Sequence, residues 1–303
     1  MLKKGSSFIK PQHLLQDLNF ETGGKLTGKV SHWERLLALS IQTPASAEAD
    51  WFDKDLCASL VDLSKWNGDV NWSKLWGKTH GVIYRLGYGA VQDKRFADVA
   101  IPGFANAPDE RYCALYHYMN TGVSKQAQSD LVLESITKMG GRVNAFWVDI
   151  EAAYNEESAG SYFSNPKAIM DAVRAEYPSM PVGFYTNGRG WNALNKLGNP
   201  KDWLEQYLFW YAWYPYNPTR YPKPPSGLGL NDIYVWQYLA DGNGLGYEYG
   251  VSSFSVDINV TRDNIDKFLE DNVTGENPDP PPIPDDWNLA LDAVQDAVEL
   301  LRR

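Results

Sequence analysis

An alternation of strand and helix patterns runs through the middle of the chain and limits its fold more than any other feature. Short apolar runs that suit strands are followed five times by segments that suit helices. Such an alternation predicts parallel strands joined by crossover helices, in a sheet that is covered on both faces. The expected strands are 59–63, 81–86, 112–118, 143–151 and 181–185, and the expected helices are 72–76, 95–107, 124–139, 166–177 and 190–197.

Helical patterns become rare after residue 197. Three further strands are expected over 208–213, 233–238 and 253–257, and a final helix is expected over 262–270. Eight strands of this kind indicate an α/β barrel whose last third has lost most of its helices. A long Tyr- and Pro-rich segment, Tyr214–Asn231, follows the sixth strand and is expected to form a wall beside any site there.

The segments that flank the barrel differ from it in composition. Residues 1–56 form a mixed, polar extension of unknown role, and the barrel is assigned to residues 57–272. Residues 273–286 contain a run of prolines, which favours an extended, semi-rigid linker. In residues 287–303 apolar side chains recur at heptad spacing and predict an amphipathic helix. These side chains are Trp287, Leu291, Val294, Val298 and Leu301. The helix either packs back on the barrel or binds a second copy or another partner.

The charge balance and hydropathy exclude several classes of partner. The chain has 28 Lys and Arg against 38 Asp and Glu, a net charge of −10. A nucleic-acid surface would need a basic stripe, so no nucleic-acid partner is expected. No apolar run approaches the roughly 18 residues of a membrane span, so no membrane partner is expected either. The apolar run Leu36–Ile41 is too short and too far from the N-terminus for a convincing signal peptide.

The cysteines and histidines give no sign of a metal site or a disulfide framework. Cys57 and Cys113 are the two cysteines, and they fall on strands that are not adjacent, so a disulfide is not expected. By strand alternation His117 faces away from Tyr116 and Tyr118, which makes it a structural histidine. We expect neither a metal nor a cofactor.

The stretch Phe146–Glu151 begins as a buried strand and ends in two acids. Side chains alternate along a strand, so Trp147, Asp149 and Glu151 share one face. The two acids lie about 7 Å apart at the backbone, from a rise of roughly 3.3 Å per residue. Like charges in a partly dry site raise the pKa of one acid, and a glycosidase needs one protonated acid beside an ionised partner. A strand end whose acids simply reach solvent is the plainer alternative.

Other acids and several aromatic residues also stand at expected strand ends. The first strand ends near Asp62 and the eighth at Asp257. Because the carboxyl ends of barrel strands meet at one edge, four acids are expected to converge there. Taken singly, each of these two aspartates could instead cap a loop. The aromatic residues at the strand ends are Tyr116, Tyr118, Tyr185, Trp213, Trp236 and Tyr238.

Seven short motifs follow one another along the chain, most of them at a strand end. They are Val61-Asp62-Leu63-Ser64 with Trp66 and Gly68, Trp72, Tyr116-His117-Tyr118, Val148-Asp149-Ile150-Glu151, Tyr185-Thr186, Trp236-Gln237-Tyr238 and Val256-Asp257-Ile258-Asn259. In order and spacing they resemble glycoside hydrolase family 25, the muramidases of phage endolysins, bacteria and fungi, over about residues 58–270. The resemblance implies a flattened, TIM-like barrel of five β/α units plus three strands. It also implies cleavage of the β-1,4 bond between N-acetylmuramic acid and N-acetylglucosamine in bacterial peptidoglycan.

The resemblance further implies roles for individual residues. Glu151 would be the general acid, and Asp149 would stay ionised and steer the substrate's N-acetyl group or support the positive charge that develops. Asp62 and Asp257 would line the floor of the site and position the sugar. A substrate-assisted route and an inverting route both remain open. The candidate substrate contacts are Tyr118, Tyr185, Trp213 and Trp236, with core packing as the alternative for Tyr118 and the two tryptophans.

Two other functions remain open beside the muramidase. A chitinase-like N-acetylhexosamine hydrolase would share the Asp-x-Glu pattern, although the motifs around Asp62 and Asp257 favour a muramidase. A non-catalytic protein that binds the cell wall, or a structural virion protein, could use the same scaffold. The lack of a convincing signal peptide and the possible assembly helix 287–303 favour a phage-encoded protein that acts at the bacterial wall, either as part of the virion or after release at lysis.

Overall fold

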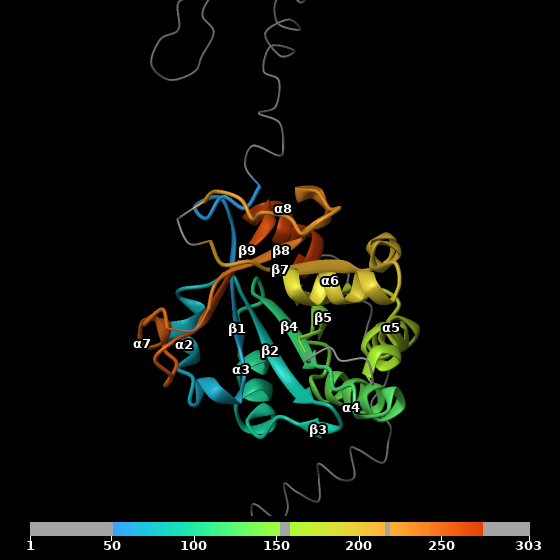
Figure 1. The fold of residues 1–303 in the computed structure, drawn as a ribbon. Helices are drawn as coiled ribbons and strands as arrows, with labels where there is room; N and C mark the ends of the chain where they lie inside the picture. The colour runs from blue at the N-terminus through green and yellow to red at the C-terminus, as the bar shows by residue number, and fades with distance from the viewer. Residues whose placement is uncertain (1–50, 152–157, 216–218, 241, 275–303) are drawn as a thin grey trace, which may run out of the picture. The chain divides into compact units, whose positions relative to one another are not determined.

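The computed structural model describes residues 51–274 except 152–157, 216–218 and 241 (Figure 1). All of these residues belong to Glu48–Arg303, the second of the two units into which the chain divides. The expected helix 287–303, and nearly all of the expected extension and linker, therefore lie outside the described residues. Their assignments stay predictions.

The described strands form one sheet that closes on itself (Figure 1). They are β1 (Cys57–Leu63), β2 (Gly81–Tyr88), β3 (Val91–Gln92), β4 (Tyr112–Tyr118), β5 (Ala145–Asp149), β6 (Val182–Asn187), β7 (Leu208–Ala212), β8 (Val235–Leu239) and β9 (Asp257–Asn264). Closure follows from β1, which pairs with β2 on one side and with β9 on the other. In the part of the chain that is described, eight strands thus make the barrel in the order β1-β2-β4-β5-β6-β7-β8-β9, and β3 forms a hairpin with β2.

The last barrel strand differs from its prediction in both place and direction. The expected strand 253–257 is wrong, because β9 begins at Asp257, where that strand was expected to end. β9 is antiparallel to both of its neighbours, β1 and β8. Polar residues at alternate positions hid this strand in the sequence. Asn259 and Thr261 bond to β1 instead of facing solvent: Asn259 donates to Asp62, and Thr261 accepts from the Ala58 amide.

The described helices are α2 (Trp72–Trp76), α3 (Ile101–Ala105), α4 (Lys125–Lys138), α5 (Ala159–Glu176), α6 (Gly188–Leu197), α7 (Gly246–Tyr249) and α8 (Ile265–Leu269). α2 to α6 follow the first five barrel strands, with a π-helical turn, Phe96–Ala100, before α3. The predicted arrangement of five β/α units and three further strands is therefore confirmed. Figure 1 shows α4 and α5 packed side by side. None of the described helices is long and apolar enough to cross a membrane.

Local sequence explains where several helices begin. The Ser124 side chain accepts from the amide of Ala127 and caps α4, and the Asn187 side chain caps α6 in the same way. The start of α5 at Pro166 was predicted wrongly. Proline is favoured in a first helical turn, but here Pro166 lies inside a helix that begins at Ala159.

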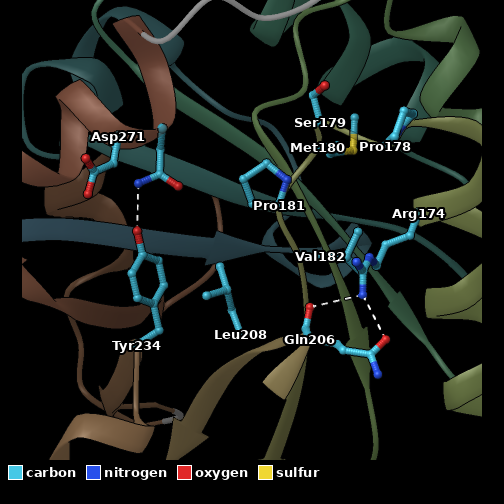
Figure 2. Close-up of a pocket in the computed structure, with 11 residues that line it drawn as sticks. Arg174, Pro178, Ser179, Met180, Pro181, Val182, Gln206, Leu208, Tyr234 and Asp271 are labelled. Atoms are coloured by element: carbon cyan, nitrogen blue, oxygen red, sulfur yellow. Dashed lines mark hydrogen bonds between the residues drawn. The ribbon is translucent and has the colours of Figure 1, made fainter. Parts of the chain in front are cut away.

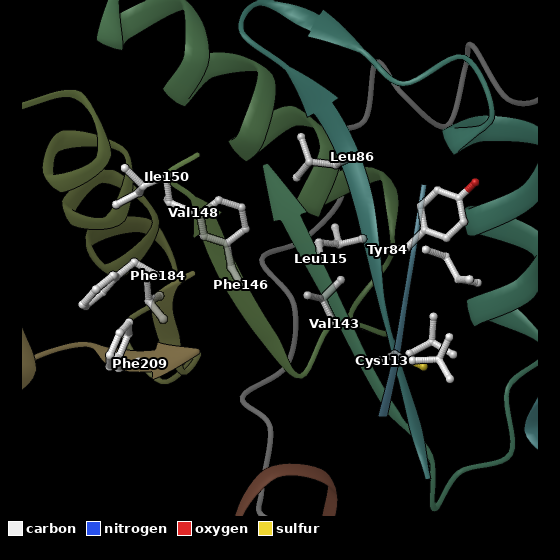
Figure 3. Packing of buried hydrophobic residues seen from close by; sticks show 14 of the residues in the cluster. Tyr84, Leu86, Cys113, Leu115, Val143, Phe146, Val148, Ile150, Phe184 and Phe209 are labelled. Atoms are coloured by element: carbon white, nitrogen blue, oxygen red, sulfur yellow. The ribbon is translucent and has the colours of Figure 1, made fainter. Parts of the chain in front are cut away.

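Buried side chains form two layers, one on each face of the closed sheet. The outer layer lies between strands and helices, and Figure 3 shows part of it, with Leu115, Phe146 and Phe184 among its members. The inner layer fills the barrel itself. In it, the Trp210 ring lies 5.8 Å from the Trp147 ring and 4.5 Å from the Tyr185 ring, measured between centroids. The inner layer is thus aromatic and closely packed.

The N-terminal end of the barrel interior is closed by α8. Phe268 of this helix is fully buried in the inner layer, with its ring 4.9 Å from that of Tyr112 at the start of β4. The space left for polar chemistry is therefore at the other end, where the parallel strands finish.

The cysteines and His117 lie where the sequence analysis expects them. Cys57 and Cys113 are buried and free, so the absence of a bond between them is confirmed. His117 is buried, with its Nε2 3.2 Å from Oε1 of Gln128. Burial lowers the pKa of His117 to about 4, although the bond to Gln128 acts the other way. It is a neutral structural histidine at ordinary pH.

Candidate active site

Four acids lie at the end of the barrel where the parallel strands finish. Asp62 is the penultimate residue of β1, Asp149 ends β5, and Glu151 follows two residues later. Asp257 reaches the same end by another route, because it begins the antiparallel β9 and is the Cα partner of Asp62. The structure therefore brings together the acids that the sequence analysis proposed, although it reverses the reason given for Asp257.

Asp149 is the most enclosed of these acids. Its side chain follows Trp147 along the inner face of β5, and the residue is only 4 % exposed. Within the described part of the chain, its Oδ1 is buried and has no hydrogen-bond partner. Burial raises the pKa of Asp149 well above its ordinary value, the charges of Glu151 and Asp62 raise it further, and Arg85 opposes them. These effects oppose the ionised form that the sequence analysis expects for Asp149, and only Arg85 favours that form.

Asp62 is buried as well, but it is held by two amides. Gln237 Nε2 donates to Asp62 Oδ2 at 2.8 Å, and Asn259 Nδ2 donates to the same oxygen at 2.9 Å. Burial raises the pKa of Asp62 to about 6, the two amide bonds counteract part of the rise, and the charge of Glu151 adds to it. Asp62 therefore changes its charge near neutral pH.

Glu151 is the exposed acid of the group. Its Oε1 lies 3.4 Å from the Tyr185 hydroxyl and 3.5 Å from Nδ2 of Asn187, both on β6. The Tyr185 hydroxyl also donates to Oε1 of Gln237 at 2.8 Å. Glu151 thus stands at the open side of the site, where an incoming molecule can reach it, whereas Asp149 lies deeper.

A cation lies beside the acids on β2. Arg85 pairs with the buried Asp93 at 2.8 Å, and its charge acts on both Asp149 and Tyr116. Asp93 also accepts from the backbone amide of Lys65, so this ion pair joins β2 to the loop after β1. Arg85 therefore offsets part of the negative charge at this end of the barrel.

The aromatic candidates divide into two groups. Tyr118 is half-buried at the end of β4, with its ring 5.3 Å from that of the exposed Tyr88, and this pair is open to a ligand. Trp236 is fully buried in the outer layer, and its Nε1 donates to the backbone oxygen of Trp213. Trp213 packs in the same layer. Strand alternation points these tryptophans away from the barrel interior, so we retain neither as a sugar contact.

A pocket of about 400 Å³ lies at the opposite end of the barrel (Figure 2). Its lining includes the residues that begin β6 and β7, and its charged groups already have partners. Arg174 donates to Gln206, and Asp271 pairs with Lys267 at 2.5 Å. Nor do the described residues include a group of three or more His, Cys, Asp or Glu that could hold a metal ion. The acids at the carboxyl end of the strands are therefore the better candidate site.

Comparison with known proteins places this arrangement in a family. The sequence model of glycosyl hydrolases family 25 matches residues 61–247, which is more than half of the chain. The chain belongs to glycosyl hydrolase family 25. It is therefore a glycoside hydrolase, as the motifs predicted. A comparison with curated proteins finds no significant match.

Solved structures with the family 25 fold resemble the barrel. The bacterial lysozyme from Streptomyces coelicolor matches with a TM-score of 0.57 at 21 % identity, over 72 % of this chain and 98 % of the other. The catalytic domain of endolysin ply40, from bacteriophage P40 of Listeria monocytogenes, gives 0.53 at 19 % identity, with the same two coverages. A muramidase from Trichobolus zukalii gives 0.54 at 18 % identity, over 72 % and 99 %. At these identities the likeness establishes the fold.

Three polar residues of the candidate site were missed by the sequence analysis. Gln237 and Asn259 stand inside the quoted motifs, yet only the neighbouring Trp236 and Asp257 were given roles. The signal was available, because strand alternation turns Gln237 inward whenever Trp236 points outward. Tyr214 was included only as part of a wall, but its hydroxyl donates to Gln237.

Proposed function

We propose that the chain hydrolyses bacterial peptidoglycan at the β-1,4 bond between N-acetylmuramic acid and N-acetylglucosamine. Membership of family 25 supports the reaction class. The names of similar structures, which include a lysozyme, a muramidase and an endolysin, support the substrate. The observation that carries the proposal is the pairing of an exposed Glu151 with a buried Asp149 whose Oδ1 lacks a partner among the described residues.

Glu151 is the proposed general acid. It stands at the open side of the site, where its carboxyl group can protonate the glycosidic oxygen that leaves. The neighbouring acids support this role, because negative charge nearby favours the protonated form of a carboxyl group. After the bond breaks, the ionised Glu151 can take a proton from the attacking water and return to its first state.

Asp149 is proposed to act on the substrate's N-acetyl group. Its buried Oδ1 is an acceptor that the described protein leaves unused, and an acetamido N–H would supply the missing donor. Such a bond favours the charged form of Asp149 and offsets the effect of burial. The charged form would then turn the acetyl oxygen toward the anomeric carbon or stabilise the positive charge there. The anomeric form of the first product, followed by NMR, distinguishes this retaining route from an inverting one.

Asp62 and Asp257 are proposed to position the sugar from the floor of the site. Tyr118 and Tyr185 remain the proposed aromatic contacts, Tyr118 through its partly exposed ring and Tyr185 through its hydroxyl beside Glu151. The place of action would be the bacterial wall. An origin in a phage, and a partner bound through residues 287–303, remain proposals from the sequence.

The test is loss of turbidity of purified bacterial walls, with mass spectrometry of the released fragments. Fragments with reducing muramic acid ends support the proposal, and reducing glucosamine ends would favour the chitinase-like alternative. Glu151→Gln should lower the rate by about 10²- to 10⁴-fold, the usual contribution of a general acid. Glu134→Gln on the surface of α4 is the matched control and should keep full activity. Lysis at an unchanged rate by the Glu151 variant would discard the assignment.

A further inference from the structure

A single buried amide connects Asp62 to Tyr185. Gln237 is 2 % exposed, and each end of its side-chain amide has partners. Nε2 donates to Asp62 Oδ2 at 2.8 Å. Oε1 accepts from the hydroxyls of Tyr185, at 2.8 Å, and of Tyr214. The protonation state of Asp62 is therefore linked, through the side chain of Gln237, to Tyr185, whose hydroxyl lies near Oε1 of Glu151.

The orientation of this amide is fixed by its surroundings. If it turned over, its oxygen would face the carboxylate of Asp62, and two acceptors would meet without a proton between them. The second amide on Asp62 is fixed in a similar way. The indole N–H of Trp210, which can only donate, bonds to Oδ1 of Asn259 at 2.8 Å and so turns Nδ2 of Asn259 toward Asp62. Each of the two amides therefore points its N–H group at Asp62, and a hydrogen bond to its oxygen holds it in that orientation.

The fixed amide decides where the proton of Tyr185 lies. A hydroxyl carries one proton, and the acceptors near Tyr185 are Gln237 at 2.8 Å, Glu151 at 3.4 Å and the oxygen of the Tyr214 hydroxyl, which itself donates to Gln237. The shorter contact takes the proton. Tyr185 then presents only lone pairs to Glu151, so their contact is a hydrogen bond when Glu151 carries a proton and donates it. If Glu151 were ionised, its carboxylate oxygen and the Tyr185 oxygen would be two acceptors facing each other with no proton between them.

We infer that Gln237 is a positioning residue for the general acid: by holding the Tyr185 proton, it leaves Tyr185 as an acceptor for the protonated carboxyl group of Glu151. The inference rests on the proposed function, because it takes Glu151 as the acid. It assigns a task to a residue that need not touch the sugar. No bond is made or broken in this step, and no proton leaves the network.

Other groups that act on Glu151 must be separated from this effect. Charged or titratable side chains face it from most strands around the site. They are Asp62 on β1, Tyr118 on β4, Asp149 on β5, Tyr162 on α5, Tyr185 on β6 and Tyr214 after β7, and beside these Arg85 acts on Asp149 and Arg189 on Tyr162. A change at Gln237 also removes one amide from Asp62, which alters the charge near Glu151 without Tyr185. A test therefore needs the tyrosine variant as a background.

The experiment follows kcat/KM of the full-length chain on purified walls against pH. The limb on which activity falls as pH rises reports the general acid. Tyr185→Phe should move this limb to lower pH by about one unit, because the protonated carboxyl group loses its acceptor. Gln237→Met should move it in the same direction, because the freed Tyr185 proton can then turn to an ionised Glu151. In the Tyr185→Phe background, Gln237→Met should cause a clearly smaller shift, because only the effect of the amide lost from Asp62 remains.

The opposite result is equally clear. If Tyr185 instead donates to an ionised Glu151, Tyr185→Phe moves the limb to higher pH and overturns the inference. A shift by Gln237→Met that is as large without the Tyr185 hydroxyl as with it also overturns the inference. Tyr211→Phe is the matched control, because the Tyr211 side chain lies in the outer layer and should leave the limb in place. Failure of the proposed function looks different, since wild-type chain would then release no fragments at any pH.

Discussion

At the scale of single residues, the site combines two buried carboxyl groups that the fold treats differently. Asp62 receives two amide N–H groups, whereas Oδ1 of Asp149 has no partner among the described residues. An unsatisfied buried acceptor lowers the stability of the folded chain. Such a group is expected where a ligand supplies the missing donor, so the unpaired acceptor supports the proposed contact between Asp149 and the substrate.

This defect makes stability depend on pH. The pKa of Asp149 is raised above its ordinary 3.8, so the folded chain holds the proton more tightly than the unfolded chain does. The stability that this provides is present below pH 3.8 and is lost as pH rises through the folded value. Asp149→Asn should therefore raise the melting temperature at pH 8 by about 5 °C, change it little at pH 4, and lower activity strongly. Calorimetry at both pH values tests this.

Asp130→Asn, on the exposed face of α4, is the matched control and should leave the melting temperature in place at both pH values. A melting temperature for Asp149→Asn that is unchanged or lower at pH 8 would contradict the claim that a charged, buried Asp149 destabilises the folded chain.

The acids could be predicted from the sequence, because two carboxyl groups two residues apart at a strand end are visible without coordinates. Their partners could not. Whether Gln237 meets Asp62 depends on how β8, β9 and β1 are aligned in the closed sheet, and that register is set by contacts between residues far apart in the chain. Asp257 was placed at the correct end of the barrel with the wrong strand direction.

At the scale of elements, strand β6 depends on a residue without a side chain. Gly183 lies beside Trp147 in the sheet, and a Cβ added there would stand 2.3 Å from the Trp147 ring and 2.6 Å from the backbone oxygen of Leu208. Gly183→Ala should therefore cost about 1–3 kcal/mol of unfolding free energy, the usual range for an overfilled core. It should also lower activity, because Trp147 is two residues from Asp149 on the same face.

Urea unfolding measures the loss of stability expected for Gly183→Ala. Gly160→Ala provides the control, because an added Cβ meets nothing within 4 Å there and the residue lies in α5. That substitution should be neutral or slightly stabilising. Equal loss of stability in both variants would show that the close approach of β6 to Trp147 does not matter.

The elements that the sequence predicted well are the parallel strands with apolar residues on both faces, such as β4 and β5. β9 was misplaced because its inward residues are polar, and α5 was shortened because Pro166 was taken as a first turn. For β9, hydrogen bonds to β1 overrode the local pattern.

At the scale of the whole molecule, every proposed site residue lies within the described range 51–274. Removing residues 277–303 should therefore leave hydrolysis of short, soluble peptidoglycan fragments unchanged. Light scattering of the full and shortened chains addresses the role of the heptad pattern in residues 287–303. A dimer that becomes a monomer on removal supports self-association, and a monomer in both cases rules it out. Loss of hydrolysis by the shortened chain would contradict the placement of the site.

The closure of the barrel by β1 and β9 has a consequence for when the chain gains activity. Asp62 and its partner Asn259 are 197 positions apart, and they meet only across this final seam. A nascent chain on the ribosome carries Asp62, Asp149 and Glu151 long before Asn259 has been synthesised. We therefore expect hydrolysis only after translation has passed β9 and the two ends of the sheet have joined, and we expect none from products of interrupted synthesis that lack β9.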